Sequence, residues 1–389
     1  MQIDHIQQEL RSEDLDGWLF FDHHHRDPLA YRVLGLAPEQ QVTRRWYYLI
    51  PQVGEPRGLV HRVECEVLSA LPGEKTLYSS WKEQIDGLAR ILRGCQNIAM
   101  QYSPQCAIPY VAMVDAGTIE MVRGLGVEIS SSAELVQHFE ARWTEEQLQS
   151  HLEAGRKVDN VRRCAFDMIR EKTRAGQPVQ EIAVKSFILD HFAAAGLQTD
   201  HGPVVGANVN SANPHYEPTQ ERSAVIRSGD FVLLDMWAKL NKPNAVYYDI
   251  TWTGYCGNDP PEEIRRVFHI VTTARDLAID RVRKAAALKE TLRGFEVDDA
   301  ARNYIASKGF SEFFTHRTGH SIGQDVHGNG ANMDNLETHD ERRIVPGTCF
   351  SIEPGIYLEK FGVRSEVNVF RAESEAYVTG EMQQELVIL

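Results

Sequence analysis

The sequence predicts a two-part α+β protein, in which a smaller α/β domain precedes a larger α+β domain with an internal duplication. Three observations lead to this prediction. The 389 residues suggest two or three domains, at roughly 150 residues each. Short apolar runs alternate with helical stretches up to residue 142, and beyond it the order helix, helix, strands occurs twice. We therefore expect one domain over 1–142 and a second over 143–389.

The first 142 residues contain the local signals of an α/β domain. Apolar runs predict strands over 17–21, 46–50 and 97–100, and an amphipathic stretch predicts a helix over 81–92. The run His23-His24-His25 follows the first of these strands. Three adjacent side chains cannot converge on one metal ion, so we expect this run to be a loop without a catalytic role.

The remaining residues predict two rounds of helices and strands. Thr144 and Gln147 fit a capping box at the start of a long helix, and Pro260-Pro261 open another. The halves share no visible sequence identity, so the duplication rests on this pattern alone. The expected helices span 144–174, 178–193, 262–290 and 297–307, and the expected strands lie at 202–206, 231–239, 246–253, near Phe313, and at 348–353 and 362–371.

Composition and charge narrow the range of partners and locations. Acidic residues outnumber basic ones by 55 to 41, the net charge is −14, and no Lys/Arg-rich block occurs. Nucleic acid and anionic membranes are therefore not expected as partners. The six cysteines form no CxxC pair, and no apolar stretch reaches the ~18 residues of a membrane span. With a polar N-terminal segment, these features favour a cytoplasmic protein.

Carboxylates inside otherwise apolar strands carry the strongest functional signal. An unpaired charge in a strand core is costly, so each needs a partner. Arg364 lies in the same expected strand as Glu366, and a period of two places both on one face. A bound cation would relieve the repulsion among the four residues concerned, which are Asp235, Asp249, Glu353 and Glu366.

A histidine-rich segment over 316–327 offers a further ligand. His316 and His320 have helical spacing, but Gly319 and Gly323 argue against a helix. No HExxH motif occurs, so a helix-borne zinc site is not expected. A single histidine flanked by glycines is more often a hydrogen-bonded structural residue, and it is the neighbouring carboxylates that favour a ligand here.

Five motifs together resemble the pita-bread metallopeptidases, the family of methionine aminopeptidase, aminopeptidase P and prolidase. The resemblance covers roughly 144–389, while the first 140 residues resemble a creatinase/prolidase-type N-terminal domain in size and character. It implies two metal ions, with Asp249 and Glu366 bridging them, Asp235 chelating one, and His320 and Glu353 holding the other. The motifs are LLDMW, YYDITWT, HRTGHSIGQDVHG, SIEPGIY and VRSEVNV.

The resemblance also implies a reaction, namely metal-assisted attack of water on the peptide bond before proline. Glu353 would exchange the proton, and His215 and His327 would donate hydrogen bonds to the substrate. His316 would line the substrate pocket, and Arg364 would position a ligand carboxylate beside the substrate. Oxygen-rich ligation with one imidazole favours two Mn(II) ions, with Co(II) or Zn(II) as alternatives.

Several functions remain open at this point. The compact length favours a Xaa-Pro dipeptidase over a Xaa-Pro aminopeptidase, acting on small peptides as a homodimer. One alternative is a creatinase-like C–N hydrolase that works without metal. The other is a non-catalytic peptide-binding module on the same fold. Retention of all five ligands argues against both alternatives.

The sequence also departs from the family pattern. The interval from Asp235 to Asp249 is a few residues longer than usual. Trp237 and Trp252 stand where small and basic residues are common. The polar stretch 328–343 is an insertion that forms either a solvated loop or a pocket rim limiting substrate length. These departures affect the choice of substrate more than the metal chemistry.

Overall fold

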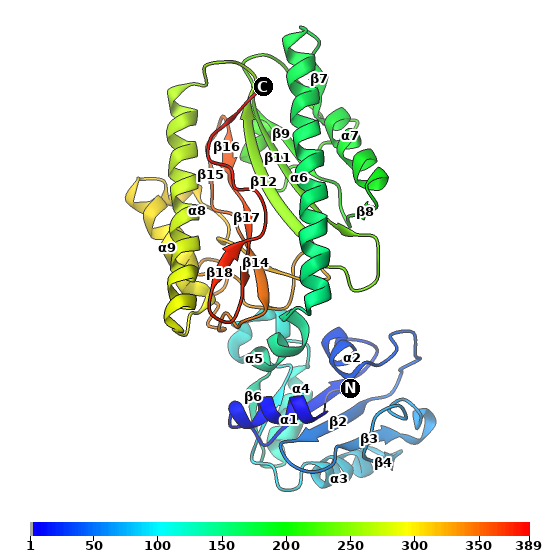
Figure 1. The fold of residues 1–389 in the computed structure, drawn as a ribbon. Helices are drawn as coiled ribbons and strands as arrows, with labels where there is room; N and C mark the ends of the chain where they lie inside the picture. The colour runs from blue at the N-terminus through cyan, green and yellow to red at the C-terminus, as the bar shows by residue number, and fades with distance from the viewer. Residues whose placement is uncertain (1–2) are drawn as a thin grey trace. The chain divides into compact units, whose positions relative to one another are not determined.

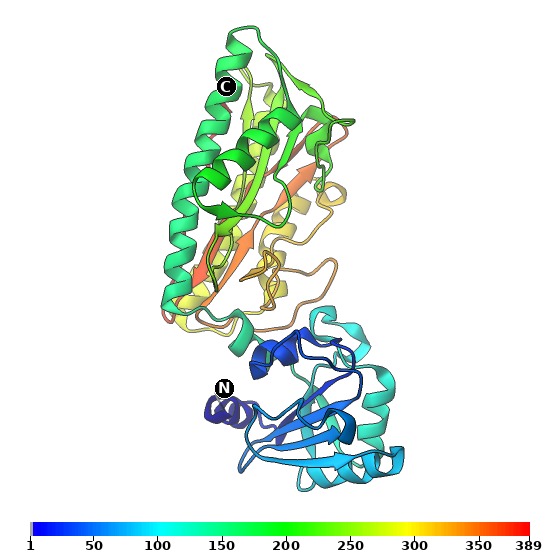
Figure 2. The same cartoon turned by 90° about the vertical axis from the view of Figure 1, so that its right-hand side faces the viewer.

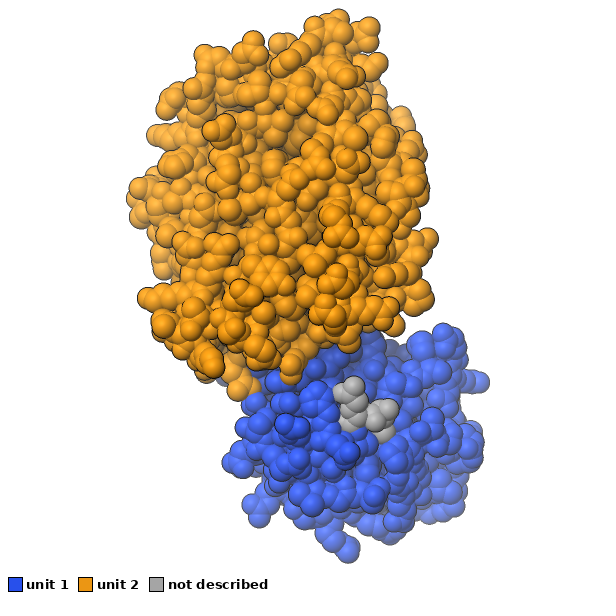
Figure 3. Space-filling model, in the orientation of Figure 1, with its two compact units in different colours: residues 1–140 blue, residues 141–389 orange. Residues whose placement is uncertain are grey.

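A computed structural model describes residues 3–389 of the chain. The chain divides into two compact units, residues 1–140 and residues 141–389, which Figure 3 colours separately. We call them the N-terminal unit and the C-terminal unit and describe each by itself. Among the described residues, no helix combines the length and the apolar character that a membrane span requires.

The N-terminal unit is built on one mixed six-stranded sheet in the order β4-β3-β2-β1-β5-β6. Alternate residues of β1 enter two apolar cores, Trp18 and Phe20 on one face and Leu19 and Phe21 on the other. The predicted strands and helix are confirmed in β1, β2, β5 and α3 (Figure 1). The elements are α1 Ile3–Ser12, β1 Gly17–Asp22, α2 Pro28–Leu34, β2 Trp46–Pro51, β3 Arg57–His61, β4 Glu74–Tyr78, α3 Trp81–Ile91, β5 Asn97–Met100, α4 Ala116–Gly124, β6 Glu128–Ser131 and α5 Ala133–Val136.

The histidine run forms a loop after β1, as predicted. The Asp22 carboxylate closes this loop by accepting hydrogen bonds from the backbone N–H groups of His25 and Arg26, at 3.0 and 2.7 Å. His24 and His25 adopt left-handed backbone angles, with φ of 63° and 55°. These three histidines do not form a group able to hold one metal ion among the described residues.

The C-terminal unit repeats a pair of helices followed by strands, which confirms the predicted α+β pattern. Figures 1 and 2 show α6 and α8 covering the strands of the two halves. The first half contains α6 Glu145–Arg174, β7 Val179–Gln180, α7 Glu181–Ala194, β8 Leu197–Gln198, β9 Val204–Ala207, β10 Val225–Ile226, β11 Phe231–Leu240 and β12 Tyr248–Tyr255. The second contains α8 Glu262–Leu288, α9 Gly294–Ser307, β13 Ser321–Ile322, β14 Thr348–Ile352, β15 Gly355–Tyr357, β16 Gly362–Arg364, β17 Val367–Arg371, β18 Ala376–Val378 and β19 Val387–Ile388.

The long helix α6 begins where the sequence predicts it. Thr144 and Gln147 form the expected capping box, in which each side chain binds the backbone N–H of the other residue. Leu234 and Met236 of β11 enter the apolar core that α6 supplies. The alternate residues of β11 face the second half, where Phe231 and Leu233 join the core formed with α8. The same alternation sends Asp235 towards the second half.

Two predicted strands differ from the structure. Near Phe313 the chain forms a 3₁₀ turn over Ser311–Phe313, and the carbonyl groups of Phe314 and His316 that follow accept hydrogen bonds from the Arg302 guanidinium and not from a neighbouring strand. The expected strand over 362–371 is two strands, since β16 pairs with β15 while β17 pairs with β14. The break between them leaves Glu366 outside both ladders.

The segment that carries His320 is not helical, as Gly319 and Gly323 predict. Gly319 is required here by close approach of the backbone, because a Cβ atom at this position would lie 1.9 Å from the carbonyl oxygen of Ser351. The segment therefore packs directly against β14, and it brings His320 beside the residues that follow that strand.

Candidate metal centre

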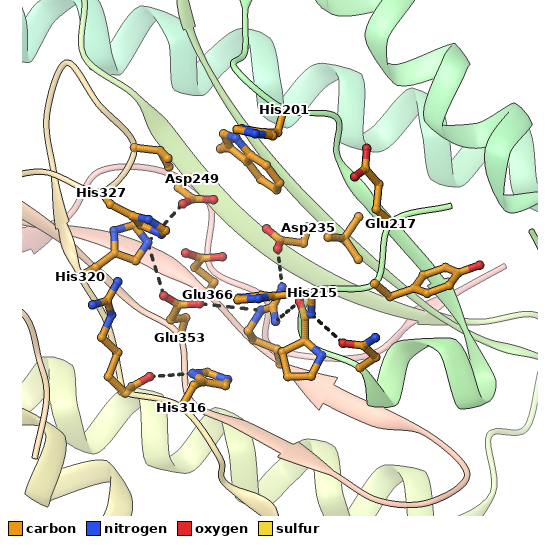
Figure 4. A pocket seen from close by; sticks show the side chains of 18 of the residues that line it. His201, His215, Glu217, Asp235, Asp249, His316, His320, His327, Glu353 and Glu366 are labelled. Carbon is orange, nitrogen blue, oxygen red and sulfur yellow. Dashed lines mark hydrogen bonds and ion pairs between the residues drawn. The ribbon is translucent and has the colours of Figure 1, made fainter. Parts of the chain in front are cut away.

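The five predicted ligands come together in one cavity of the C-terminal unit. The cavity has a volume of about 660 Å³, and all five side chains line it. Figure 4 shows their carboxylates and the imidazole of His320 pointing towards one another. The first half supplies Asp235 from β11 and Asp249 from β12, and the second half supplies His320 before β13, Glu353 after β14 and Glu366 before β17.

His320 occupies the centre of this group. Its Nε2 atom lies 3.5 Å from Oδ2 of Asp249 and 3.4 Å from Oε1 of Glu353. Its Nδ1 atom lies 3.1 Å from the carbonyl oxygen of Ser321, which can only accept, so Nδ1 carries the proton. Burial lowers the pKa of His320 and favours the neutral ring. The lone pair of Nε2 therefore points into the cavity, as a metal ligand requires.

The carboxylates have buried oxygen atoms that no protein group satisfies. Among the described residues, Oδ1 of Asp249 and Oε1 of Glu366 are buried without a hydrogen-bond partner. One ligand atom from each of Asp249, His320 and Glu366 lies within 4.8 Å of the others. Burial raises the pKa of Asp249 to about 7, and burial together with Asp249 raises that of Glu366 well above its usual value. This donor set fits divalent metal ions, which would neutralise the charges.

Arg364 holds Asp235 in place. Its Nη2 atom donates to the Asp235 carboxylate, its Nε atom donates to the Thr251 hydroxyl at 2.9 Å, and its Nη1 atom donates to the Tyr357 hydroxyl at 3.0 Å. Burial nevertheless raises the pKa of Asp235 to about 6 against the opposing effect of Arg364. Arg364 is thus committed to neighbouring protein groups and orients one ligand carboxylate.

The other predicted histidines also line the cavity. The ring of His327 packs edge-on against that of His320, with centroids 4.4 Å apart, and the pKa of His327 is lowered to about 3, first by the neighbouring His320 and then by burial. His215 is exposed to the cavity. Both ring nitrogens of His316 bind protein groups, with Nδ1 2.7 Å from the carbonyl oxygen of Arg317 and Nε2 2.7 Å from the Tyr357 hydroxyl.

Three residues that sequence reasoning did not identify support the ligands. Thr251 donates to Oε2 of Glu366 at 2.8 Å, and Ser351 donates to Oε1 of Glu353 at 3.1 Å. The Asn368 side chain accepts from the Asp249 N–H at 3.0 Å and donates to its carbonyl oxygen. Each residue lies two positions from a ligand, so the strand period of two is the signal that could have identified them.

The polar segment 328–343 is anchored by four buried polar residues, while residues 335–337, 339 and 341 are exposed. Asn332, Asp334, Asp340 and Arg342 are at most 3% exposed. Asp340 accepts from the N–H of Asn332 at 2.8 Å and from Nε and Nη2 of Arg342 at 2.9 and 2.6 Å. Glu337 from this segment lines the cavity. A buried ion pair thus anchors a segment that contributes Glu337 to the cavity, and its role in limiting substrate length stays a prediction.

Replacing Asp340 with alanine is expected to destabilise the C-terminal unit by about 3–5 kcal/mol, because it breaks the buried ion pair between Asp340 and Arg342. Urea unfolding of the C-terminal unit measures this change. Glu341→Ala is the matched control, because the Glu341 side chain is 67% exposed and its loss should change stability by at most about 0.5 kcal/mol. Equal unfolding midpoints for the two variants would contradict the role of the Asp340 pair.

The cavity holds a donor set that fits divalent metal ions, and comparison with known proteins identifies the family. The model of metallopeptidase family M24 matches residues 149–373. Because this match covers more than half of the chain, the chain belongs to metallopeptidase family M24. The expected pita-bread fold with a preceding N-terminal domain is confirmed by this family and by the solved structures described next.

Two relatives illustrate the similarity in sequence. The Xaa-Pro dipeptidase of Lactobacillus delbrueckii subsp. lactis is 28% identical over 235 residues, which are 60% of this chain and 58% of that protein. The Xaa-Pro dipeptidase of Pyrococcus horikoshii is 26% identical over 370 residues, which are 93% of each chain. Several of the curated relatives are matched over less than two thirds of their length.

Solved structures show the same fold over the whole chain. Dipeptidase PepE from Mycobacterium ulcerans superimposes with a TM-score of 0.70 at 22% identity, covering 100% of this chain and 96% of that chain. Prolidase from Thermococcus sibiricus superimposes with a TM-score of 0.65 at 23% identity, covering 100% and 98%. At these identities the likeness concerns the fold.

Proposed function

We propose that this protein is a dinuclear metallopeptidase that cleaves the peptide bond before proline. The observation that supports this most is the convergence of five ligand side chains in one cavity, with unpartnered buried oxygens on Asp249 and Glu366. The names of the relatives, which include Xaa-Pro dipeptidases and Xaa-Pro aminopeptidases, supply the substrate class. We favour a dipeptidase, because Glu337 of the polar segment 328–343 lines the cavity and can limit the length of the peptide that fits.

The two ions would supply Lewis acidity, which generates a nucleophile from water at neutral pH and polarises the scissile carbonyl. Glu353 has a pKa raised by burial, so it can accept a proton from water and pass it to the leaving nitrogen. His327 is neutral at pH 7, and its ring N–H can donate to the substrate carbonyl. His215, exposed to the cavity, can donate to the substrate carboxylate.

The remaining details of the proposal rest on ligand type and on the sequence. Four carboxylates and one imidazole favour Mn(II), with Co(II) and Zn(II) as alternatives. We also propose that the N-terminal unit is a creatinase/prolidase-type domain, which agrees with its mixed sheet and its 140 residues. A homodimer and a cytoplasmic location stay predictions from the sequence.

Hydrolysis of Ala-Pro and Gly-Pro tests the proposed function directly. Chelator-treated protein should be inactive and should recover activity when Mn(II) or Co(II) is added. Elemental analysis should find two ions per chain in the active protein. Full activity in protein verified to be metal-free would contradict the proposal and favour the creatinase-like hydrolase. Metal binding without hydrolysis of any Xaa-Pro peptide would favour the non-catalytic module.

Replacing His327 with alanine is expected to slow turnover by ~10²-fold or more, as for loss of a transition-state hydrogen bond. Metal content should stay near normal, because the carboxylates and His320 remain. Steady-state kinetics and elemental analysis measure both effects. His269→Ala is a suitable control, since His269 is exposed on α8 and is not among the residues that line the cavity. Loss of the metals from His327→Ala would mean that the roles of His320 and His327 are exchanged.

A further inference from the structure

Trp237 is a bulky side chain placed directly beside two of the metal ligands. It follows Asp235 by two positions in β11, so both side chains point to the same face of the sheet. It lies opposite Asp249 in the antiparallel pairing of β11 with β12. Directly opposite residues have Cβ atoms about 4.5–5.5 Å apart. The indole therefore forms a wall of the cavity next to the reacting centre.

A hydrogen bond fixes this wall. Nε1 of Trp237 donates to Oδ1 of Asp200 at 2.8 Å, and the other oxygen of Asp200 lies 3.3 Å from Nδ1 of His201. The indole also packs against the apolar core of the second half. Tryptophan has only two side-chain torsions, so one hydrogen bond and one packed face hold the ring in a single position. The Trp237 indole therefore occupies the same part of the cavity wall before and after substrate binds.

Charge indicates which end of a substrate meets the indole. A Xaa-Pro dipeptide carries its ammonium group on the residue before proline and its carboxylate on the proline. Asp200 adds a carboxylate that is hydrogen-bonded to the Trp237 indole, and the two other carboxylates that line the cavity outside the five ligands are those of Glu217 and Glu337. Figure 4 shows His201 on one side of the ligand carboxylates and His215 and His316 on the other. Because Asp200 is the carboxylate hydrogen-bonded to the indole, we expect the ammonium end to lie towards Asp200 and Trp237 and the proline to lie towards His215.

We propose that Trp237 limits the size of the side chain before proline, so that Gly-Pro and Ala-Pro are cleaved in preference to dipeptides with large first residues. Asp200 acts through Trp237 as a positioning residue. This inference rests on the proposed function and adds the selectivity of the site. The inference gives a role to the large side chain at position 237, which stands beside the ligands Asp235 and Asp249.

Relative kcat/KM values for Gly-Pro, Ala-Pro, Leu-Pro and Phe-Pro test the inference in the Mn(II)-loaded full-length protein. Trp237→Gly should raise the ratio of Phe-Pro to Ala-Pro at least about tenfold, because a change of one methylene in a pocket already alters selectivity 10–200-fold. Trp237→Phe should change this ratio less than Trp237→Gly. Asp200→Ala should raise the ratio of Phe-Pro to Ala-Pro by an intermediate factor. This variant replaces Trp237→Gly in the test if Trp237→Gly fails to fold.

Trp252→Phe is the matched control. Trp252 belongs to β12 and pairs with Leu234, so it lies on the opposite face of the sheet, where the guanidinium of Arg162 stacks on it. Its replacement should leave the substrate ratio unchanged. An unchanged ratio in Trp237→Gly and Asp200→Ala, with metal content intact, would overturn the inference. An equal loss of kcat/KM towards all four dipeptides in Trp237→Gly would also overturn the inference, since the indole would then face the proline. Wild-type protein that cleaves none of them would contradict the proposed function itself.

Discussion

Glu366→Ala is expected to abolish both metal binding and peptide hydrolysis. One oxygen of Glu366 is buried without a partner, and the other accepts a hydrogen bond from Thr251 at 2.8 Å. One ligand atom of Glu366 lies within 4.8 Å of those of Asp249 and His320, and we propose that Glu366 bridges the two ions. Losing a bridging ligand removes a donor from both ions at once. Elemental analysis and an Ala-Pro assay measure the two losses.

A second variant separates ligation from folding. Glu366→Gln keeps the side-chain volume and an oxygen that can accept from Thr251, yet it removes the charge. We expect it to fold, to lose metal as the alanine variant does, and to be more stable than wild-type protein when both lack metal, because one buried charge is gone. Glu375→Ala, an exposed carboxylate, is the control and should keep its metal. Two retained ions in Glu366→Ala would refute the assignment.

Metal should raise the melting temperature of the C-terminal unit strongly at pH 8 and only slightly at pH 5. Metal that binds only the folded state adds RT ln(1 + [L]/Kd), roughly 4 kcal/mol at a thousandfold excess over Kd. In a domain of this size that corresponds to roughly 10 °C. The ligands Asp235, Asp249, Glu353 and Glu366 all have pKa values raised by burial, so protons compete with metal as the pH falls.

The direction of the pH effect follows from proton linkage. The pKa values of Asp235 and Asp249 are about 6 and 7 in the folded metal-free protein, against about 3.9 in an unfolded chain. Groups with a raised folded pKa contribute stability that is full below the unfolded pKa and lost as pH rises through the folded pKa. The metal-free site therefore loses stability between about pH 4 and 7. Bound cations restore it at pH 8.

Thermal melts with Mn(II) and with chelator, at pH 8 and at pH 5, measure this linkage. Comparing the two samples at each pH cancels the contribution of groups that the metal does not touch. Hydrogen exchange of peptides from β11 and β12 should slow when metal is added, while peptides from residues 3–140 should change little. Identical melting curves in all four conditions would mean that the carboxylates do not form one metal site.

The candidate carboxylate ligands were predictable because they are charged residues inside otherwise apolar strands. Asp235 and Asp249 interrupt apolar strands, and the motifs around them resemble one known family. The division of the expected 362–371 strand was not predictable, since it depends on β16 and β17 pairing with different strands. Nor does the sequence reveal that Asn332 and Asp340 are buried, because polar residues are buried only where folding supplies their hydrogen-bond partners.

The division of the ligands between two halves of one unit has a consequence for the order of folding. Asp249 and Glu366 are 117 residues apart in the chain, and the site exists only after the strands of both halves have packed together. An ion cannot guide the early steps, because no early structure presents the complete donor set. It binds a chain that is already close to native, so it should slow unfolding while leaving the refolding rate nearly unchanged. Bound metal then protects the protein chiefly by lengthening the lifetime of its folded state.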